Sequence, residues 1–326
     1  MNFKMIKSEK ILITGCNGFV GRHLVSQLSK SPSSSFVCAS RVAHEQSPKF
    51  IPVGSIGPDT DWSEALKDVT HIVHLAGRAH IMREKTADRS LYEMTNTAGT
   101  LRLAEQAASA GVKRLVFIST IKVCGDGTLS PQIYGYNETD TAESLHEDPY
   151  ALSKYNAEVG LTKIAKNTEL EFCILRPPII YGPGVKGNLL SLTKAIGRGY
   201  PLPFGDARNN QRSMISVFNL IDAILAALYH PNAKNEIFNV ADAEAVSTKE
   251  LVEIISEAMH VKPKLVQIPK DVCRIAAGIT GKVGLYNRIF GNLKVDSRKI
   301  NYKLGWTPPG RLAEELRISF AAKGPK

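Results

Sequence analysis

Short apolar runs alternate with longer stretches of helical period along the first half of the chain. The runs are rich in β-branched residues, which is typical of strands buried on both faces of a parallel sheet. We predict five such strands before residue 177, at Ile11–Thr14, Phe36–Ala39, His71–Leu75, Arg114–Ile118 and Phe172–Leu175. Strands that alternate with helices predict an α/β fold, a Rossmann-type doubly wound parallel sheet with covering helices.

The pattern changes after Arg176, where proline and glycine residues interrupt shorter helical stretches. A smaller lobe is therefore predicted to begin there. One more strand, at Glu236–Val240, predicts a return to the sheet, and Ser247 with Glu250 has the spacing of a capping box for the next helix. We predict a dinucleotide-binding domain over 1–176 and about 213–242, and a discontinuous α/β substrate lobe over 177–212 and 243–326.

Composition narrows the class of ligand. The 326 residues suffice for two lobes with buried cores. Lysine and arginine exceed the acidic residues by 41 to 31, and the net charge of +10 favours an anionic ligand. Because the basic residues are scattered and lack interleaved aromatic residues, a phosphorylated metabolite is favoured over nucleic acid. Five cysteines without a Cys-x-x-Cys pair indicate neither a disulfide framework nor a zinc site, so we expect a cytoplasmic protein.

Hydropathy gives no sign of a membrane span. No stretch approaches the roughly 18 consecutive apolar residues that a spanning helix needs, and the charged N-terminus lacks the hydrophobic core of a signal peptide. The Cys273–Tyr286 region is fairly apolar, although Arg274 and Lys282 interrupt it. We expect a buried helix there, with a peripheral membrane contact left open.

The first chemical motif is a glycine-rich turn directly after the first strand, Thr14-Gly15-Cys16-Asn17-Gly18-Phe19-Val20-Gly21. Gly15 and Gly18 would let the backbone approach a pyrophosphate. Gly21 would let the following helix, predicted at 19–30, pack closely, and the start of that helix favours negative charge. An ordinary glycine-rich turn is the alternative, but the strand before it and the helix after it favour dinucleotide binding.

The end of the second strand bears on the choice of dinucleotide. In NAD-binding proteins an acidic residue commonly receives the adenosine ribose at this point, whereas this strand ends Ala39-Ser40-Arg41. The guanidinium of Arg41 can pair with a 2′-phosphate, so NADP is favoured over NAD. The alternative is that Arg41 is a solvated loop residue and that the cofactor is NAD.

Two further motifs carry proton chemistry. Tyr150 and Lys154 follow Asp148-Pro149, a good helix start, and their spacing places them on one helix face, where an ammonium can lower the pKa of a phenol. Ser119 and Thr120 end the fourth predicted strand, at the sheet edge where doubly wound folds bind ligands. A half-buried tyrosine beside a solvated lysine, and two strand-end caps, are the alternatives. The order of these motifs along the chain favours the catalytic interpretation.

Taken in order, these motifs resemble the extended short-chain dehydrogenase/reductase superfamily, in its NAD-dependent epimerase/dehydratase group. His74-Leu75-Ala76-Gly77, Asn96-x-x-Gly99-Thr100 and the segment from Leu175 to Pro183 extend the resemblance over nearly the whole chain. It implies a homodimer packed through helices at about 97–111 and 150–166. It also implies catalysis by Thr120, Tyr150 and Lys154, and a cofactor held by Gly15, Asn17, Gly18, Phe19, Val20, Gly21, Arg41, Leu75, Ala76, Gly77, Asn96, Lys154 and Pro177.

Lys122 distinguishes among the reactions of this group. Nucleotide-sugar 4,6-dehydratases resemble this segment but carry Asp and Glu at the positions of Ile121 and Lys122, because eliminating water needs an acid and a base. The Ile121-Lys122-Val123 sequence looks most like that of bacterial reductases of UDP-4-keto-6-deoxy-N-acetylhexosamines, which feed surface polysaccharide (O-antigen) synthesis. A UDP-sugar 4-epimerase and a non-catalytic cofactor sensor are the alternatives.

For the UDP-sugar, the resemblance implies contacts with Ser119, Lys122, Asn188 and Arg212, the last two near the diphosphate. A planar guanidinium suits a diphosphate. The histidines His71, His74 and His80 are expected to pack or to hydrogen-bond rather than to hold a metal, because this chemistry needs none.

Overall fold

Seven parallel strands form one large sheet at the centre of the computed structural model, which describes residues 9–31, 34–42, 50–78, 89–127, 135–281 and 283–321. The strand order is β3-β2-β1-β4-β5-β6-β9. It reverses direction between β1 and β4, as in a doubly wound Rossmann sheet, so the predicted fold class is confirmed. The strands are β1 (Lys10–Thr14), β2 (Ser35–Ser40), β3 (Phe50–Pro52), β4 (His71–His74), β5 (Arg114–Ile118), β6 (Glu171–Arg176) and β9 (Glu236–Asn239).

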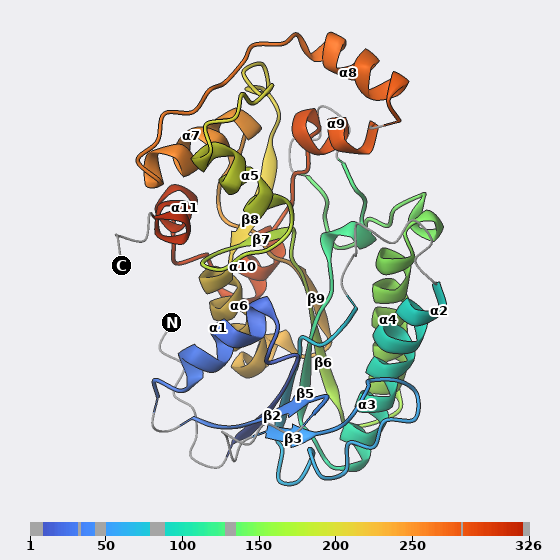
Figure 1. Ribbon diagram of the computed structural model, residues 1–326. Coiled ribbons are helices and arrows are strands. Elements are labelled where there is room, and N and C mark those ends of the chain that lie inside the picture. Colours follow the sequence, from blue (N-terminus) through green and yellow to red (C-terminus); the bar gives the residue numbers. More distant parts are fainter. Residues whose placement is uncertain are drawn as a thin grey trace.

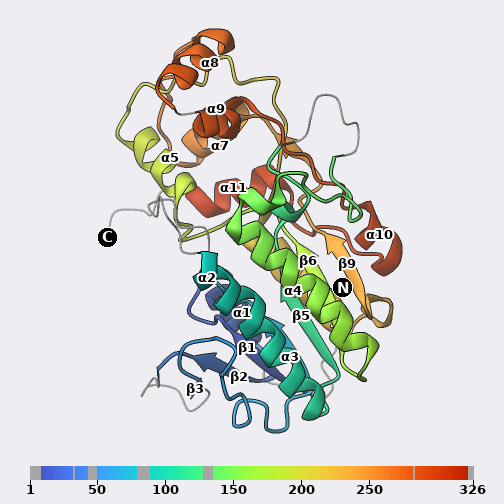
Figure 2. The same cartoon turned by 90° about the vertical axis from the view of Figure 1, so that its right-hand side faces the viewer.

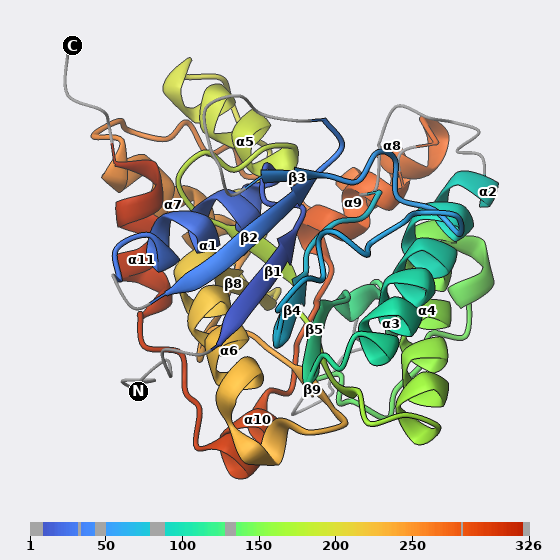
Figure 3. The same cartoon turned by 90° about the horizontal axis from the view of Figure 1, so that it is seen from below.

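Helices cover both faces of this sheet, as Figures 1 and 3 show. The side chains of β5 alternate between the two cores, because Val116 and Ile118 pack toward one set of helices and Leu115 and Phe117 toward the other. Burial on both faces explains why the strands are continuous apolar runs. The first set is α1 (Phe19–Leu28), α6 (Val217–Tyr229) and α10 (Arg298–Leu304), and the second set is α3 (Gly99–Ser109) and α4 (Pro149–Lys166).

A second, three-stranded sheet with its own core forms the smaller lobe at the top of Figure 1. Its strands, in spatial order, are β10 (Ala245–Val246), β8 (Arg212–Ser216) and β7 (Ile179–Tyr181). The helices around it are α5 (Asn188–Gly197), α7 (Thr248–Ala258) and α11 (Leu312–Phe320). β7 and β8, which precede β9 in the sequence, thus share one sheet with β10, which follows it. The return to the large sheet begins with α6 rather than with β8.

The large-sheet strands predicted from sequence are all present, with ends within one residue of the prediction. The capping box of Ser247 and Glu250 at the start of α7 is also confirmed. The prediction missed β3, which spans only three residues and ends in a proline, so it has no periodic signal. Helix α1 ends at Leu28, before the predicted end at residue 30.

The expectation of a buried helix at Cys273–Tyr286 is wrong. Two short helices occupy this region, α8 (Lys270–Ile279) and α9 (Val283–Phe290), and only Ala277 of α8 and no residue of α9 is buried. Among the described residues, no helix is both long enough and apolar enough to cross a bilayer.

The carboxyl end of β6 is tied to α4 by a buried ion pair. Arg176 Nε donates to Glu158 Oε1 at 3.0 Å and Arg176 Nη2 donates to Glu158 Oε2 at 2.5 Å, and neither side chain is more than 4% exposed. Arg176 Nη1 also donates to the Glu138 carbonyl at 3.0 Å. This pair locks the last residue of a central strand to the long helix beside it.

We expect Glu158→Gln to lower the free energy of unfolding by about 3–5 kcal/mol, because it leaves a buried guanidinium without a compensating charge. Urea unfolding followed by circular dichroism measures the loss. Glu257→Gln is a matched control, since its carboxylate pairs with Arg317 on the surface at 3.1 Å and its loss should cost at most about 1 kcal/mol. Equal losses in the two variants would show that the buried pair has no special weight.

Candidate active site

The glycine-rich turn joins β1 to α1 and lies against the end of β4. Gly15 has a φ of +68°, and a Cβ added to it would lie 2.6 Å from the Ala76 backbone nitrogen. A Cβ on Gly21 would lie 2.2 Å from the Gly15 carbonyl oxygen. Both positions therefore require glycine, as the motif predicted.

The start of α1 has the properties of a pyrophosphate site. Gly18 is its N-cap, so no side-chain oxygen caps the first backbone N–H groups of the helix. Asn17 and Gly18 are exposed, whereas Phe19 and Val20 are partly buried beside them. These residues fit the diphosphate of a dinucleotide, which the N–H groups would receive.

His74 holds the end of β4 in place. Its Nδ1 lies 2.7 Å from Thr14 Oγ1 and its Nε2 lies 2.9 Å from Thr100 Oγ1. Burial lowers the pKa of His74 to about 3, so the ring is neutral. The same Thr14 hydroxyl accepts a hydrogen bond from the Ala76 N–H at 3.1 Å. The packing role expected for His74 is thus observed. His80 lies outside the described residues.

Gly77, Asn96 and Lys154, all predicted to contact the cofactor, meet beyond the end of β4. A Cβ on Gly77 would lie 3.0 Å from Asn96 Oδ1 and 3.3 Å from Lys154 Nζ. Asn96 is fully buried, and its amide bonds both backbone groups of Arg78, with Arg78 N–H donating at 2.7 Å and Asn96 Nδ2 donating to the Arg78 carbonyl at 3.1 Å. Asn96 therefore holds the loop of Leu75, Ala76 and Gly77 in position.

The predicted catalytic residues Thr120, Tyr150 and Lys154 also come together. The Thr120 hydroxyl lies close enough to the Tyr150 phenol to lower its pKa. Lys154 is 5% exposed, and its Nζ donates to the Ile118 carbonyl at 2.9 Å and lies 4.5 Å from the centre of the Phe117 ring. Two side chains from α4 and one hydroxyl from the end of β5 therefore share one site.

The proton affinities at this site are set by burial. Burial raises the pKa of Tyr150 to about 12; the nearby Thr120 hydroxyl opposes this rise, and the charge of Asp148 adds to it. Burial lowers the pKa of Lys154 to about 8. The Lys154 ammonium faces the Ile118 carbonyl, so the expected lowering of the Tyr150 pKa by this ammonium is not seen. The phenol is fully protonated at neutral pH.

Ser119 has a buried hydroxyl whose hydrogen bonding is unsatisfied by the described residues. It is 3% exposed, and within the described part of the chain its Oγ has no hydrogen-bond partner. Buried polar groups without partners are rare and call for an explanation. The neighbouring strand ends are fixed, because the buried Pro177 accepts a hydrogen bond from Ile121 N–H at 3.0 Å. A ligand at this edge would satisfy Ser119.

Lys122, expected to contact the sugar, is engaged by carboxylates of the protein. Its Nζ donates to Asp148 Oδ2 at 2.6 Å and lies 3.4 Å from Asp126 Oδ1. Asp148 is the N-cap of α4, and its Oδ1 accepts from the N–H groups of Tyr150 and Ala151 at 3.0 and 3.1 Å. Lys122 therefore supports the start of the helix that carries Tyr150. The sequence identified Asp148 as a helix start but not as this partner.

The predicted diphosphate residues lie in the smaller lobe. Arg212 Nη1 donates to the Gly291 carbonyl at 3.2 Å, just beyond α9. Burial lowers the pKa of Arg212, and the charge of Arg288 on α9 acts in the same direction. The sequence did not single out Arg288, because only folding brings it near Arg212. Asn188 is exposed at the start of α5, and Arg41 is exposed just after β2.

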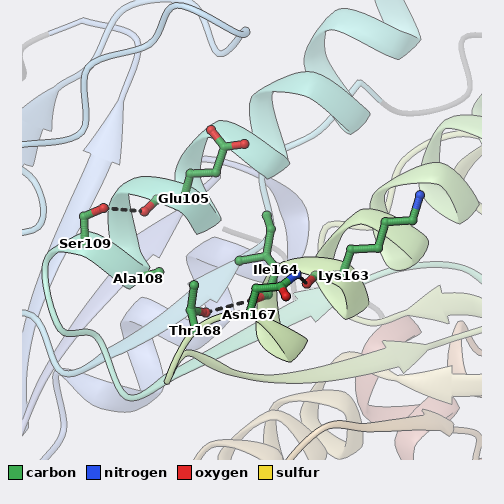
Figure 4. Close-up of a pocket in the computed structure, with 7 residues that line it drawn as sticks. All are labelled: Glu105, Ala108, Ser109, Lys163, Ile164, Asn167 and Thr168. Atoms are coloured by element: carbon green, nitrogen blue, oxygen red, sulfur yellow. Dashed lines mark hydrogen bonds between the residues drawn. The ribbon is translucent and has the colours of Figure 1, made fainter.

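A hollow between α3 and α4 lies away from these residues (Figure 4). It is near the last turns of both helices, whereas Tyr150 is at the start of α4. Its hydroxyls are satisfied within their own helices, since Ser109 donates to the Glu105 carbonyl at 3.1 Å and Thr168 to the Ile164 carbonyl at 2.9 Å. The remaining lining residues are Ala108, Lys163 and Asn167. The hydroxyls of the hollow are therefore already paired within the protein.

Comparison with known proteins agrees with this geometry. A Vibrio cholerae protein named UDP-glucose 4-epimerase is 41% identical over 323 residues, which is 98% of this chain and 96% of that relative. The structure of MoeE5 in complex with UDP-glucose and NAD superimposes with a TM-score of 0.75 at 25% identity, covering 95% of this chain and 97% of that one.

A second structure, RMD from Pseudomonas aeruginosa complexed with NADPH, has the same fold, with a TM-score of 0.71 at 22% identity over 96% of this chain and 98% of that one. The model of the NAD dependent epimerase/dehydratase family matches residues 11–241. With its glycine-rich turn, its Thr120–Tyr150–Lys154 site and these relatives, the chain belongs to the NAD dependent epimerase/dehydratase family of nucleotide-sugar enzymes.

Proposed function

We propose that this enzyme transfers a hydride between a nicotinamide dinucleotide and C4 of a UDP-hexose, with Tyr150 exchanging the proton of the C4 oxygen. The observation that carries the proposal is the Tyr150 phenol close to the Thr120 hydroxyl at the carboxyl edge of β5, beside the unpaired Ser119 hydroxyl. When bound, the dinucleotide supplies the hydride donor or acceptor. The backbone of Gly15 to Gly21 would hold its diphosphate.

Each residue of the site has a definite task in this proposal. Thr120 orients the C4 oxygen and Tyr150 donates its proton to that oxygen as charge develops there. Lys154 would hold the nicotinamide ribose. Arg212 would bind the diphosphate of the sugar nucleotide through its guanidinium, with the charge of Arg288 acting in the same region.

For the net reaction we propose the reduction of a 4-keto group, as in a UDP-4-keto-6-deoxy-N-acetylhexosamine made for surface polysaccharide. At neutral pH the phenol carries the proton that ketone reduction needs. Arg41, in place of an acidic residue after β2, favours NADPH, a cofactor that is exchanged at each turnover.

A UDP-sugar 4-epimerase is the second candidate, and the 41% identical Vibrio cholerae relative with that name favours it. An epimerase would keep NAD bound and pass the hydride out and back. A non-catalytic cofactor sensor would not need Thr120, Tyr150 and Lys154 at one site. We further propose the two-lobe division at 176/177, with a return to the first domain from α6 to about residue 242, and a homodimer through α3 and α4.

The deciding experiment begins with the nucleotide content of the purified protein and continues with NADPH and NADH oxidation on UDP-4-keto-6-deoxy-N-acetylglucosamine. Cofactor-free protein that consumes NADPH in step with the sugar would support the reductase. Tightly bound NAD, no net oxidation, and interconversion of UDP-N-acetylglucosamine with its C4 epimer would identify an epimerase. If the protein shows neither activity, the result would support a non-catalytic cofactor sensor.

Tyr150→Phe should lower kcat by roughly 10²- to 10⁴-fold, because it removes the proton donor. The Kd for the dinucleotide should stay unchanged by calorimetric titration. Tyr155→Phe removes one phenol hydroxyl from the same helix and should leave kcat near the wild-type value. Turnover that survives in Tyr150→Phe would refute the mechanism.

Lys122→Met should raise the pKa that governs the oxidation of the C4 alcohol. The charge of Asp148 raises the pKa of Tyr150, and in this variant Asp148 loses the lysine that offsets its charge. Rate profiles against pH measure this shift. Lys122→Arg should retain the wild-type profile. The double variant Lys122→Met/Asp148→Asn should return toward it, because asparagine still caps α4 without the charge. An unshifted profile in Lys122→Met would show that the lysine only packs.

Arg41→Ser should raise the KM for NADPH by about tenfold or more and leave the KM for NADH unchanged, because only NADPH has the 2′-phosphate. Initial rates with each dinucleotide test this. Lys30→Ser, which removes an exposed charge near the other end of α1, serves as the control. Equal changes for both dinucleotides would mean that Arg41 is simply solvated.

A further inference from the structure

Helices α8 and α9 form a hairpin with an apolar face that no other described residue covers. Val272, Ile275 and Ile279 share one face of α8 by their spacing of three and four, and they are 53%, 61% and 82% exposed. Val283 and Leu285 of α9 are also exposed. Five of the 16 exposed large hydrophobic side chains in the described residues therefore lie in this one hairpin.

The hairpin is fixed to the smaller lobe at both ends. The exposure of this face is therefore not a result of helices that are detached from the lobe. At one end, the Lys270 N–H donates to Asp206 Oδ2 at 3.2 Å. At the other end, Thr248 Oγ1 donates to the Ile289 carbonyl at 2.6 Å. The two helices pack on each other, and Figures 1 and 2, viewed at right angles, both show α8 at the outer end of the lobe.

The same part of the chain carries most of the net positive charge. Residues 262–294 contain one acidic residue, Asp271, and seven basic residues: Lys262, Lys264, Lys270, Arg274, Lys282, Arg288 and Lys294. Their net charge is +6 out of +10 for the whole chain. The basic residues are never adjacent, but they are concentrated here rather than scattered evenly.

We propose that the α8–α9 hairpin docks on the surface of an anionic lipid bilayer. An exposed apolar helix face within a basic stretch of the chain matches the boundary between acyl chains and acidic headgroups, where Val272, Ile275 and Ile279 would insert. A ten-residue helix is about 15 Å long, too short to span a bilayer, so α8 lies in the plane of the membrane. The docked hairpin holds the nucleotide-sugar lobe against the membrane.

Charge argues against a second copy of this chain as the occupant. A two-fold interface would bring together two copies of a stretch of net charge +6, and their repulsion would oppose association. The acidic headgroups of a bilayer supply the opposite charge.

The test is flotation of the full chain with vesicles of phosphatidylcholine, either alone or with about 40 mol% phosphatidylglycerol. Binding is expected only to the anionic vesicles, and it should weaken between about 0.1 and 0.5 M salt. Ile275→Ser/Ile279→Ser should lower the partition coefficient roughly tenfold or more. Lys262→Gln/Lys270→Gln should also lower it roughly tenfold at low salt. Ile318→Ser, at a 60% exposed position on α11, is the matched control and should bind like the wild type.

Thermal unfolding of each variant checks that the fold is intact, which is expected because the changed residues are exposed. No flotation with anionic vesicles, or flotation that Ile275→Ser/Ile279→Ser does not weaken, would overturn the proposal. A larger assembly in sedimentation velocity that is lost in the same variant, without vesicle binding, would assign the face to a second copy. Flotation does not depend on turnover, so it is independent of the proposed reaction.

Discussion

The buried pair of Arg176 and Glu158 joins the parts that have to meet for chemistry. Arg176 ends β6, Glu158 lies one turn beyond Lys154 on α4, and Arg176 Nη1 also donates to Cys124 Sγ at 3.4 Å, in the segment that follows Thr120. Two charges removed from water are satisfied only in a narrow range of geometry. This pair therefore helps to set the placement of Tyr150 and Lys154 relative to Thr120.

Asp148 has two opposing effects on the catalytic helix. Its carboxylate caps α4 and so stabilises the turn that presents Tyr150, but its negative charge also raises the pKa of that phenol. Lys122 offsets the second effect without disturbing the first, since it binds the other carboxylate oxygen. This arrangement gives a physical reason for a lysine where the dehydratases that this segment resembles have a carboxylate.

Features that depend on neighbours in sequence could be predicted, and features that depend on distant partners could not. The glycine motif and the Tyr150–Lys154 spacing are local, and so is the capping box of Ser247 and Glu250. The Lys122–Asp148 pair and the approach of Arg288 to Arg212 arise only from folding. The exposure of α8 was missed for a different reason, because an apolar helical face has the same period whether the core covers it or not.

The position of β9 has a consequence for the synthesis of this protein. β9 pairs with β6, yet the chain between them, from 177 to 235, first builds much of the smaller lobe. At translation rates of about 5–20 residues per second, β6 stays an open sheet edge on the nascent chain for roughly 3–12 seconds. An apolar edge strand without a partner recruits other strands. The nascent chain is therefore most exposed to misassociation during this interval, before the ribosome delivers the strand that closes the sheet.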